Sequence, residues 1–353
     1  MISVKDVTRA AVVAMAFLLV AGAARADTHA PWPTDWNNWN DAALWVTVGN
    51  PGNAADTRYE TPGYGAVAYT FNMGKFEVTA GQYTAFLNSV AKTDTYGLYN
   101  TDMWSNTSGW SGCNIQRTDT GSGYTYSVAA DWANRPVNYV SWGDAARFSN
   151  WLTHGQPTGV QDLTTTEDGS YYLNGAISDA DLLAVVRKSP EQGGRYYIPN
   201  EDEWYKAAYH KNGGVTGNYW DYPTGSESVP SNDLIDPDPG NNANLHQNGY
   251  TIDSPYYRTP IGEFENSESP YGTFDQGGNV WELNEAVIGS DRGLWWGGSF
   301  SHDVYYLRAE NRSDISFPTN GKVDVGFRVS EVPEPATMSL LALGGLVALR
   351  RRR

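Results

Sequence analysis

The feature that most constrains this chain is its single cysteine, Cys113. One cysteine excludes an internal disulfide, a CxxC redox pair and a cysteine-rich zinc site at the same time. The fold must therefore be held by a buried core, and 353 residues with 40% hydrophobic and 13% aromatic content are enough to form one. A lone cysteine is usually a passive small residue, and a reactive thiol is the alternative.

The charge of the chain limits the kinds of partner that it can have. It contains 24 Lys and Arg residues against 40 Asp and Glu residues, a net charge of −16. Binding to phosphate needs clustered cations that displace counterions, so we expect no nucleic-acid partner. A sugar, a cation or another protein fits this charge better.

Residues 1–26 are expected to be a secretory signal peptide. A short polar start with two basic residues precedes an apolar run from Ala10 to Ala24, and Ala24-Arg25-Ala26 is a small-x-small cleavage site. A buried N-terminal helix is the alternative. The order of the three features favours the signal peptide and processing after Ala26.

The C-terminal segment 332–353 has a second ordered pattern. Pro333-Glu334-Pro335 is followed by an apolar stretch of 14 residues and then by four arginines. At about 1.5 Å per residue, this stretch reaches roughly 21 Å and is shorter than the ~30 Å hydrocarbon core of a bilayer. We therefore expect transient membrane association, with the arginines held on the cytoplasmic side.

This combination closely resembles the PEP-CTERM sorting signal of Gram-negative bacteria. The resemblance implies recognition by a membrane transpeptidase of the exosortase type and removal of the tail. It also implies export, with delivery to the periplasm, the outer membrane or the extracellular matrix.

Three helices are expected in the body of the chain because each begins with a capping box. The pairs of residues that form these boxes are Thr79 with Gln82, Ser141 with Asp144, and Asn200 with Glu203. Each helix carries an aromatic-rich stripe, and we expect these stripes to lie in the core.

Short runs of β-forming residues are expected to be strands at Val67–Phe71, Gly194–Ile198 and Val325–Val329. Glycine and polar residues separate them, and the longest polar loop runs from Thr224 to Asn244. The pattern predicts a loop-rich α+β domain without internal repeats.

Six blocks of sequence resemble, in order, those of the formylglycine-generating enzyme or sulfatase-modifying-factor family. The blocks are Phe71–Thr79, Pro136–Ala145, Ile198–Trp204, Gly277–Glu282, Gly297–Phe300 and Gly326–Arg328. The resemblance implies a single domain over residues 64–330, preceded by an N-terminal extension over residues 27–63. It also implies an irregular, loop-rich variant of the C-type-lectin fold, with loops fixed by calcium.

The copper chemistry of this family is not expected here. The resemblance implies two cysteines after the Gly-Gly-Ser-aromatic block that bind Cu(I), for which soft thiolates are suitable ligands. In this chain the first position is Ser301 or His302, and the second is Tyr306 or Leu307. Cys113 lies in a different block, so we expect no bound copper.

The iron chemistry of the family is not expected either, because it needs a close pair of histidines and a distant third. The histidines of this chain are His29, His154, His210, His246 and His302, and no two are close in sequence. His154 and His210 fall at the predicted ends of helices, where a cation is favourable. We interpret the histidines as surface or capping residues and expect no bound iron.

A hydrolase site was also considered at His302 and Asp303, which stand beside Ser299 and Ser301. Adjacent residues of an extended segment point to opposite faces, and the sequence identifies no partner that would orient the histidine. The pattern therefore gives only weak support to a hydrolase.

Two structural calcium sites are implied by the resemblance. The first maps to Asn244, the carbonyl of Leu245, Asp253 and the carbonyl of Pro255, and the second to Asp275, the carbonyls of Gln276, Gly278 and Val280, and Glu282. Calcium prefers six to eight oxygen ligands of these kinds. The alternative is that these acids only cap turns.

A ligand groove is implied near Trp281 and Arg328. Candidate neighbours are Trp295, Trp296, Ser299 and Arg308. An aromatic face beside an arginine can hold a peptide or a sugar. The alternative is that Arg328 pairs with a buried acid and the tryptophans belong to the core.

The leading hypothesis is an exported, catalytically silent member of the family that binds a peptide or an exopolysaccharide on a calcium-stabilised scaffold. The second hypothesis is an oxidoreductase or other protein-modifying enzyme that uses the family groove with an unrecognised metal site. The third is a structural protein of the matrix. The absence of cysteine from residues 301–307 favours the first over the second.

Overall fold

A computed structural model of the chain describes residues 38–104, 112–288, 291–293, 295–312 and 317–333. The described residues belong to one compact unit. The expected signal peptide and most of the sorting segment, with Ala26, Glu334 and Pro335, lie outside the described residues.

A four-stranded antiparallel sheet joins segments from both ends of the described chain. Its strands, in spatial order, are β1 (Trp45–Val48), β2 (Phe71–Gly74), β11 (Ser330–Glu331) and β5 (Tyr196–Tyr197). Val46 is paired with Met73, and Met73 is also paired with Ser330. β1 thus belongs to the same sheet as the C-terminal strand, although it lies within residues 27–63, which we expect to be an N-terminal extension.

A second sheet carries several of the residues singled out in the sequence. It consists of β10 (Val325–Gly326), β6 (Trp281–Leu283) and β9 (Trp295–Trp296), in that order. β10 runs parallel to β6, and Gly326 is paired with Glu282. The blocks that contain Trp281 and Arg328 are therefore neighbours in space.

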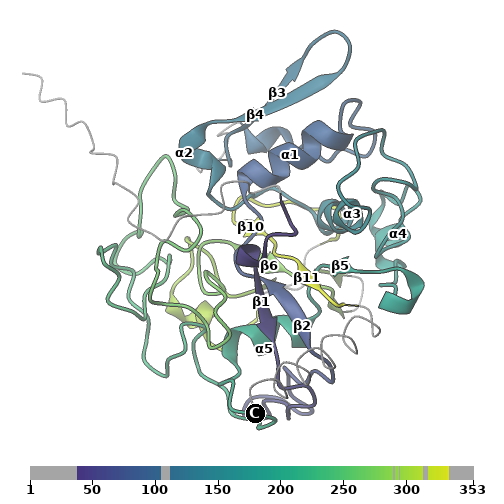
Figure 1. The fold of residues 1–353 in the computed structure, drawn as a ribbon. Coiled ribbons are helices and arrows are strands. Elements are labelled where there is room, and N and C mark those ends of the chain that lie inside the picture. The colour runs from purple at the N-terminus through teal and green to yellow at the C-terminus, as the bar shows by residue number, and fades with distance from the viewer. Residues whose placement is uncertain (1–37, 105–111, 289–290, 294, 313–316, 334–353) are drawn as a thin grey trace, which may run out of the picture. The chain divides into compact units, whose positions relative to one another are not determined.

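Two hairpins complete the β-structure of the described residues. β3 (Ile115–Asp119) pairs with β4 (Tyr124–Val128), and β7 (Val287–Ile288) pairs with β8 (Asp291–Arg292). The tip of the β3–β4 hairpin projects beyond α1 (Ala80–Val90), while β4 packs against that helix (Figure 1).

The three expected helices are present, and each begins at its predicted capping box. They are α1 (Ala80–Val90), α3 (Trp142–Thr153) and α5 (Glu201–Tyr209). The shorter helices are η1 (Ala42–Leu44), η2 (Thr101–Met103), α2 (Ala130–Ala133), α4 (Asp179–Leu183), η3 (Pro190–Gln192) and η4 (Val304–Leu307). His154 and His210 cap the C-terminal ends of α3 and α5, as expected.

The strand predictions are confirmed only in part. β5 and β10 lie inside two of the predicted runs, but the prediction for Val67–Phe71 is wrong because β2 begins only at Phe71. Val67 is buried, and its carbonyl accepts a hydrogen bond from Gly52 N in a loop. A buried apolar residue in a loop gives the same sequence signal as a strand. The loop-rich α+β class is confirmed.

The core is built from aromatic rings, as the stripes on the helices predict. Phe148 of α3 lies at its centre, and its ring centroid is 5.2–6.2 Å from those of five other rings. These rings belong to Trp39, Tyr83, Phe86, Trp151 and Phe327. Edge-to-face and tilted pairs of this kind add to the stabilisation from burial.

We predict that Phe148→Ala lowers the free energy of unfolding by about 3–5 kcal/mol, because it removes the ring that five others contact. Urea denaturation followed by tryptophan fluorescence measures the loss. Phe317, whose side chain is 55% exposed, supplies the matched control, and Phe317→Ala should change stability by no more than about 0.5 kcal/mol. Equal effects of the two substitutions would contradict this description of the core.

Candidate functional site

Arg328 forms a fully buried ion pair with Glu282 of β6. Its Nε and Nη2 atoms donate to the two carboxylate oxygens at 2.6 and 2.5 Å. The same guanidinium donates to the carbonyls of Gly74 and Phe274. Trp204 Nε1 donates to Glu282 at 2.7 Å. The pair therefore connects β2, β6, α5 and the loop before β6.

The burial of these residues decides between the two interpretations of Arg328. Trp281, Trp296, Ser299 and Arg328 are each at most 1% exposed. Arg308 is partly exposed and forms an ion pair with Glu310 at 2.6 Å. The predicted groove residues thus lie mostly inside the core, and the guanidinium of Arg328 pairs with an acid instead of facing a ligand.

Two further carboxylates lie near this ion pair. Glu77 is buried and accepts a hydrogen bond from Asn279 Nδ2 at 3.0 Å. Burial raises the pKa of Glu77 well above its ordinary value, and the negative charges of Asp275 and Glu282 raise it further. Burial also raises the pKa of Asp275, to about 7. One arginine therefore faces three acids, and the region favours either protons on the carboxyl groups or a bound cation.

The first predicted calcium site fits the structure at Asn244. Its Oδ1 atom is buried and has no hydrogen-bond partner among the described residues. Its Nδ2 atom donates to Tyr257 O and Asn279 Oδ1, each at 3.0 Å. Because a buried acceptor without a partner is costly, a cation at this oxygen would be stabilising.

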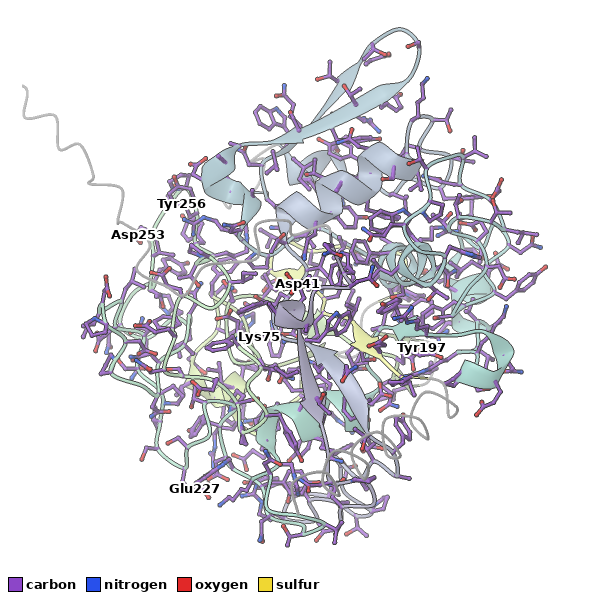
Figure 2. All side chains as sticks on the ribbon, in the orientation of Figure 1. Asp41, Lys75, Tyr197, Glu227, Asp253 and Tyr256 are labelled. Atoms are coloured by element: carbon purple, nitrogen blue, oxygen red, sulfur yellow. The ribbon has the colours of Figure 1, made fainter. Side chains whose placement is uncertain are left out.

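The other residues of the first site are arranged less favourably. Asp253 and Pro255 are exposed, and Asp253 lies on the same loop as Tyr256 (Figure 2). The carbonyl of Leu245 already accepts hydrogen bonds from Asn232 and Thr251.

The second predicted calcium site contains a cavity of about 10 Å³ lined by Asp275 and Gln276. This is close to the space that one water molecule needs. The cavity is also lined by three residues that carry side-chain oxygens, Asn242, Ser267 and Thr273. Gly278 and Val280, the other predicted carbonyl ligands, are buried and come shortly after Gln276 in the sequence. Glu282 does not fit as a ligand, because Arg328 and Trp204 use its oxygens.

Across the residues that the structure describes, no group of three or more His, Cys, Asp and Glu side chains is placed to hold a metal ion. Asp275 and Asn244 would therefore need carbonyl, amide and hydroxyl oxygens to complete a coordination shell, as calcium accepts.

The positions that would carry the copper thiolates are occupied by a polar cluster around His302. Ser299 Oγ and Ser301 Oγ lie 2.7 and 3.2 Å from His302 Nδ1. Both hydroxyls also lie within 3.3 Å of Asp324 Oδ2. Trp281 Nε1 donates to the same Nδ1 atom at 3.2 Å. Tyr306 packs its ring against that of His302.

These contacts fix the form of the imidazole. The indole N–H of Trp281 can only donate, so Nδ1 of His302 accepts and carries no proton. Burial lowers the pKa of His302, although the charge of Asp324 opposes this effect. His302 is therefore a neutral imidazole whose proton is on Nε2.

The cluster does not have the geometry of a Ser-His-Asp triad. A triad uses one ring nitrogen for the serine and the other for the acid. Here both serines and Asp324 lie at Nδ1, with Asp324 Oδ2 at 3.6 Å. The tertiary structure thus supplies the acid that the sequence did not identify, but on the wrong side of the ring for a proton relay.

Two residues of the site were missed by the sequence analysis. Glu77 lies inside the first family block and Asp324 directly precedes the strand that leads to Arg328. Their positions within or beside the blocks were the available signal. Cys113 is buried, and burial raises the pKa of its thiol, which fits a passive residue.

Two family models match the chain. The model described as the sulfatase-modifying factor enzyme 1-like domain matches residues 32–332, and the model described as the PEP-CTERM protein-sorting motif matches residues 331–353. The first match begins upstream of the expected boundary at residue 64, in agreement with the position of β1. No curated protein matches the sequence. No helix within the described part of the chain is both long and apolar enough to cross a membrane.

Several solved structures resemble this one. CarF is 22% identical over 82% of this chain and 98% of its own, with a TM-score of 0.47. Variable protein 1 of Treponema denticola is 18% identical over 82% and 95%, with a TM-score of 0.48. PvdO from Pseudomonas aeruginosa is 16% identical over 82% and 91%, with a TM-score of 0.41. At these scores we infer no function from them.

We predict that Arg328→Met lowers the free energy of unfolding by about 3–5 kcal/mol, because Glu282 is left buried without its partner. Arg195, which pairs with Glu331 but is 53% exposed, provides the control. Arg195→Met should cost less than about 1 kcal/mol. Chemical denaturation of both variants measures the difference. If Arg328→Met folded with unchanged stability, the ion pair would not have the structural role described above.

Proposed function

Because the chain belongs to the sulfatase-modifying factor enzyme 1-like domain family, we propose that it is an exported, non-catalytic member of that family. In this proposal the calcium-stabilised domain binds a peptide or a component of an exopolysaccharide. The C-terminal motif supplies the sorting signal for an exosortase-type enzyme.

The observation that carries the non-catalytic assignment is the composition of the site after Gly297-Gly298-Ser299. Oxidation of a cysteine by the family mechanism needs a pair of thiolates, and Cys113 is the only cysteine in the chain. Ser301 and His302 are the alternatives for the first of these positions, and the neighbours of His302 are hydroxyls, an indole and Asp324. None of these groups substitutes for a thiolate pair as a ligand of Cu(I).

The proposal of bound calcium rests on two places, Asn244 and the cavity at Asp275, and an isolated β-bridge connects the segments that contain them. Asn244 is paired with Gly278 in an isolated β-bridge, and its carbonyl accepts a hydrogen bond from Asn279. The unpartnered Oδ1 of Asn244 and the water-sized cavity at Asp275 are the features that support the proposal. A bound cation would offset the excess of acids near Arg328 and fix the loops that flank β6.

The destination of the protein follows from the sorting motif in this proposal. Exosortase-type processing would remove the C-terminal tail and leave the domain in the periplasm, on the outer membrane or in the extracellular matrix. The full chain has a net charge of −16, and loss of the basic signal peptide and the arginine-rich tail would make the domain more acidic, which favours solubility and disfavours anionic polymers as ligands.

A protein-modifying oxidoreductase is the second candidate. The observation in its favour is that the side chain of His302 remains 29% exposed at the position of the family's metal ligand. Imidazole is a ligand for copper and iron as well as for zinc.

We predict that calcium stabilises the metal-free protein. At a calcium concentration 100-fold above the dissociation constant the gain is about 2.7 kcal/mol, which raises the melting temperature by several degrees. Asp275→Asn should reduce this rise. Asp119→Asn, at the exposed end of β3, should leave it unchanged. Calorimetric titration without heat, together with an unchanged melting temperature, would contradict the calcium proposal.

We further predict that the protein does not oxidise a cysteine-containing sulfatase peptide in the presence of copper and oxygen. Mass spectrometry of the peptide after incubation measures the loss of the thiol, and metal analysis measures bound copper and iron. Stoichiometric copper or iron with turnover that His302→Ala abolishes would favour the oxidoreductase and overturn the non-catalytic assignment.

A further inference from the structure

A pocket that none of the predicted ligand-binding residues lines opens beside the N-terminal end of α3. Its volume is about 370 Å³, which is within the range of roughly 300–1,000 Å³ found for small-molecule sites. Four parts of the chain line it: residues 96–101, residues 139–147 with the first turns of α3, residues 177–182 with part of α4, and residues 319–321.

The lining of the pocket is aromatic and rich in hydroxyl groups. The lining includes three tyrosines, Tyr96, Tyr99 and Tyr139. It also includes three residues with aliphatic hydroxyl groups, Thr101, Ser141 and Thr319. Tyrosine offers an apolar face and a polar tip in one side chain. A ligand that has both C–H faces and hydroxyl groups matches such a lining.

Tyr96 is placed to contact a ligand. Its side chain is partly exposed, and the guanidinium of Arg147 lies over its ring at 4.6 Å from the centroid. Because Tyr96 lines the pocket and keeps part of its surface exposed, it can contact a molecule in the pocket.

The charges around the pocket are balanced within the protein. Arg147 donates to both carboxylate oxygens of Glu167, at 2.7 and 3.0 Å, and to the carbonyl of Ala176 at 2.8 Å. Asp144 accepts hydrogen bonds from Ser141 N and Oγ, and burial raises its pKa to about 6. The pocket therefore offers no unpaired cation to an anionic ligand.

The backbone at the pocket is strained in a way that packing maintains. Tyr139 has a φ of 58°, a left-handed conformation that is uncommon for a bulky residue. Gly321 packs so closely on it that a Cβ atom at residue 321 would lie 2.5 Å from Tyr139 O. Strained residues of this kind cluster at ligand sites.

We infer that this pocket binds a neutral saccharide, with Tyr96 stacking on a sugar ring and the surrounding hydroxyl and carboxyl groups bonding to its hydroxyls. The inference rests on the proposed ligand-binding function and names the ligand class and the place where it binds. Neutral sugars match the paired charges of the lining, whereas uronic acids would meet Asp144 without a free cation.

Isothermal titration and saturation-transfer NMR with cellobiose, maltose and lactose test this inference, with digalacturonate as the anionic comparison. We expect at least one neutral disaccharide to bind more tightly than digalacturonate. Tyr96→Ala should weaken this binding about tenfold or more, whereas Tyr96→Phe, which keeps the ring, should stay within about threefold of the original protein. Tyr172→Ala provides the matched control, because Tyr172 is 52% exposed and lies outside this pocket.

A second variant guards against a folding defect in Tyr96→Ala. Ile177 lines the pocket and is 61% exposed, so Ile177→Arg should fold normally and obstruct the pocket. An unchanged affinity in Ile177→Arg and Tyr96→Ala, a preference for digalacturonate, or no binding of the three neutral sugars would overturn the inference. Binding of a peptide without binding of a sugar would overturn it while leaving the proposed function intact.

Discussion

The ion pair between Arg328 and Glu282 is the interaction on which the rest of the structure depends. A buried guanidinium and carboxylate are costly to remove from water, and they are tolerated only where hydrogen bonds satisfy their remaining atoms. Arg328 meets this condition through the carbonyls of Gly74 and Phe274, and Glu282 through the indole of Trp204. These partners come from segments that are far apart in sequence. The pair therefore fixes loops that regular secondary structure does not hold.

The same requirement explains the polar character of the centre of the domain. Burial raises the pKa of Glu77 and of Asp275, and both lie close enough to the ion pair for the charge of Glu282 to raise it further. A fold with so few long strands has many loop carbonyls and amides available there, and such groups suit calcium better than thiol or imidazole metals. The proposed calcium sites are thus compatible with the single cysteine of the sequence, because they use oxygen ligands and need no thiolate.

The sequence predicted the parts of the fold that depend on local interactions. All three capping boxes begin the expected helices, because an N-cap and the residue three positions later interact within one turn. Strands were predicted less well, since pairing with distant partners decides whether a run such as Val67–Phe71 joins a sheet. The sequence did not predict β1 for the same reason: it joins the sheet through its pairing with β2, more than twenty residues away.

By itself the sequence determined the family, the sorting motif, the aromatic core of the helices and the impossibility of a thiolate pair. Only the tertiary structure decided that Arg328 and Trp281 are buried, that Asp324 joins His302, and that Tyr96, Tyr139 and Arg147 surround one pocket. A sequence motif shows which residues are present and at what spacing. This information is enough to exclude a chemistry that needs a residue the chain lacks. Burial and the sharing of a site depend on contacts between distant segments, and those contacts exist only once the chain has folded.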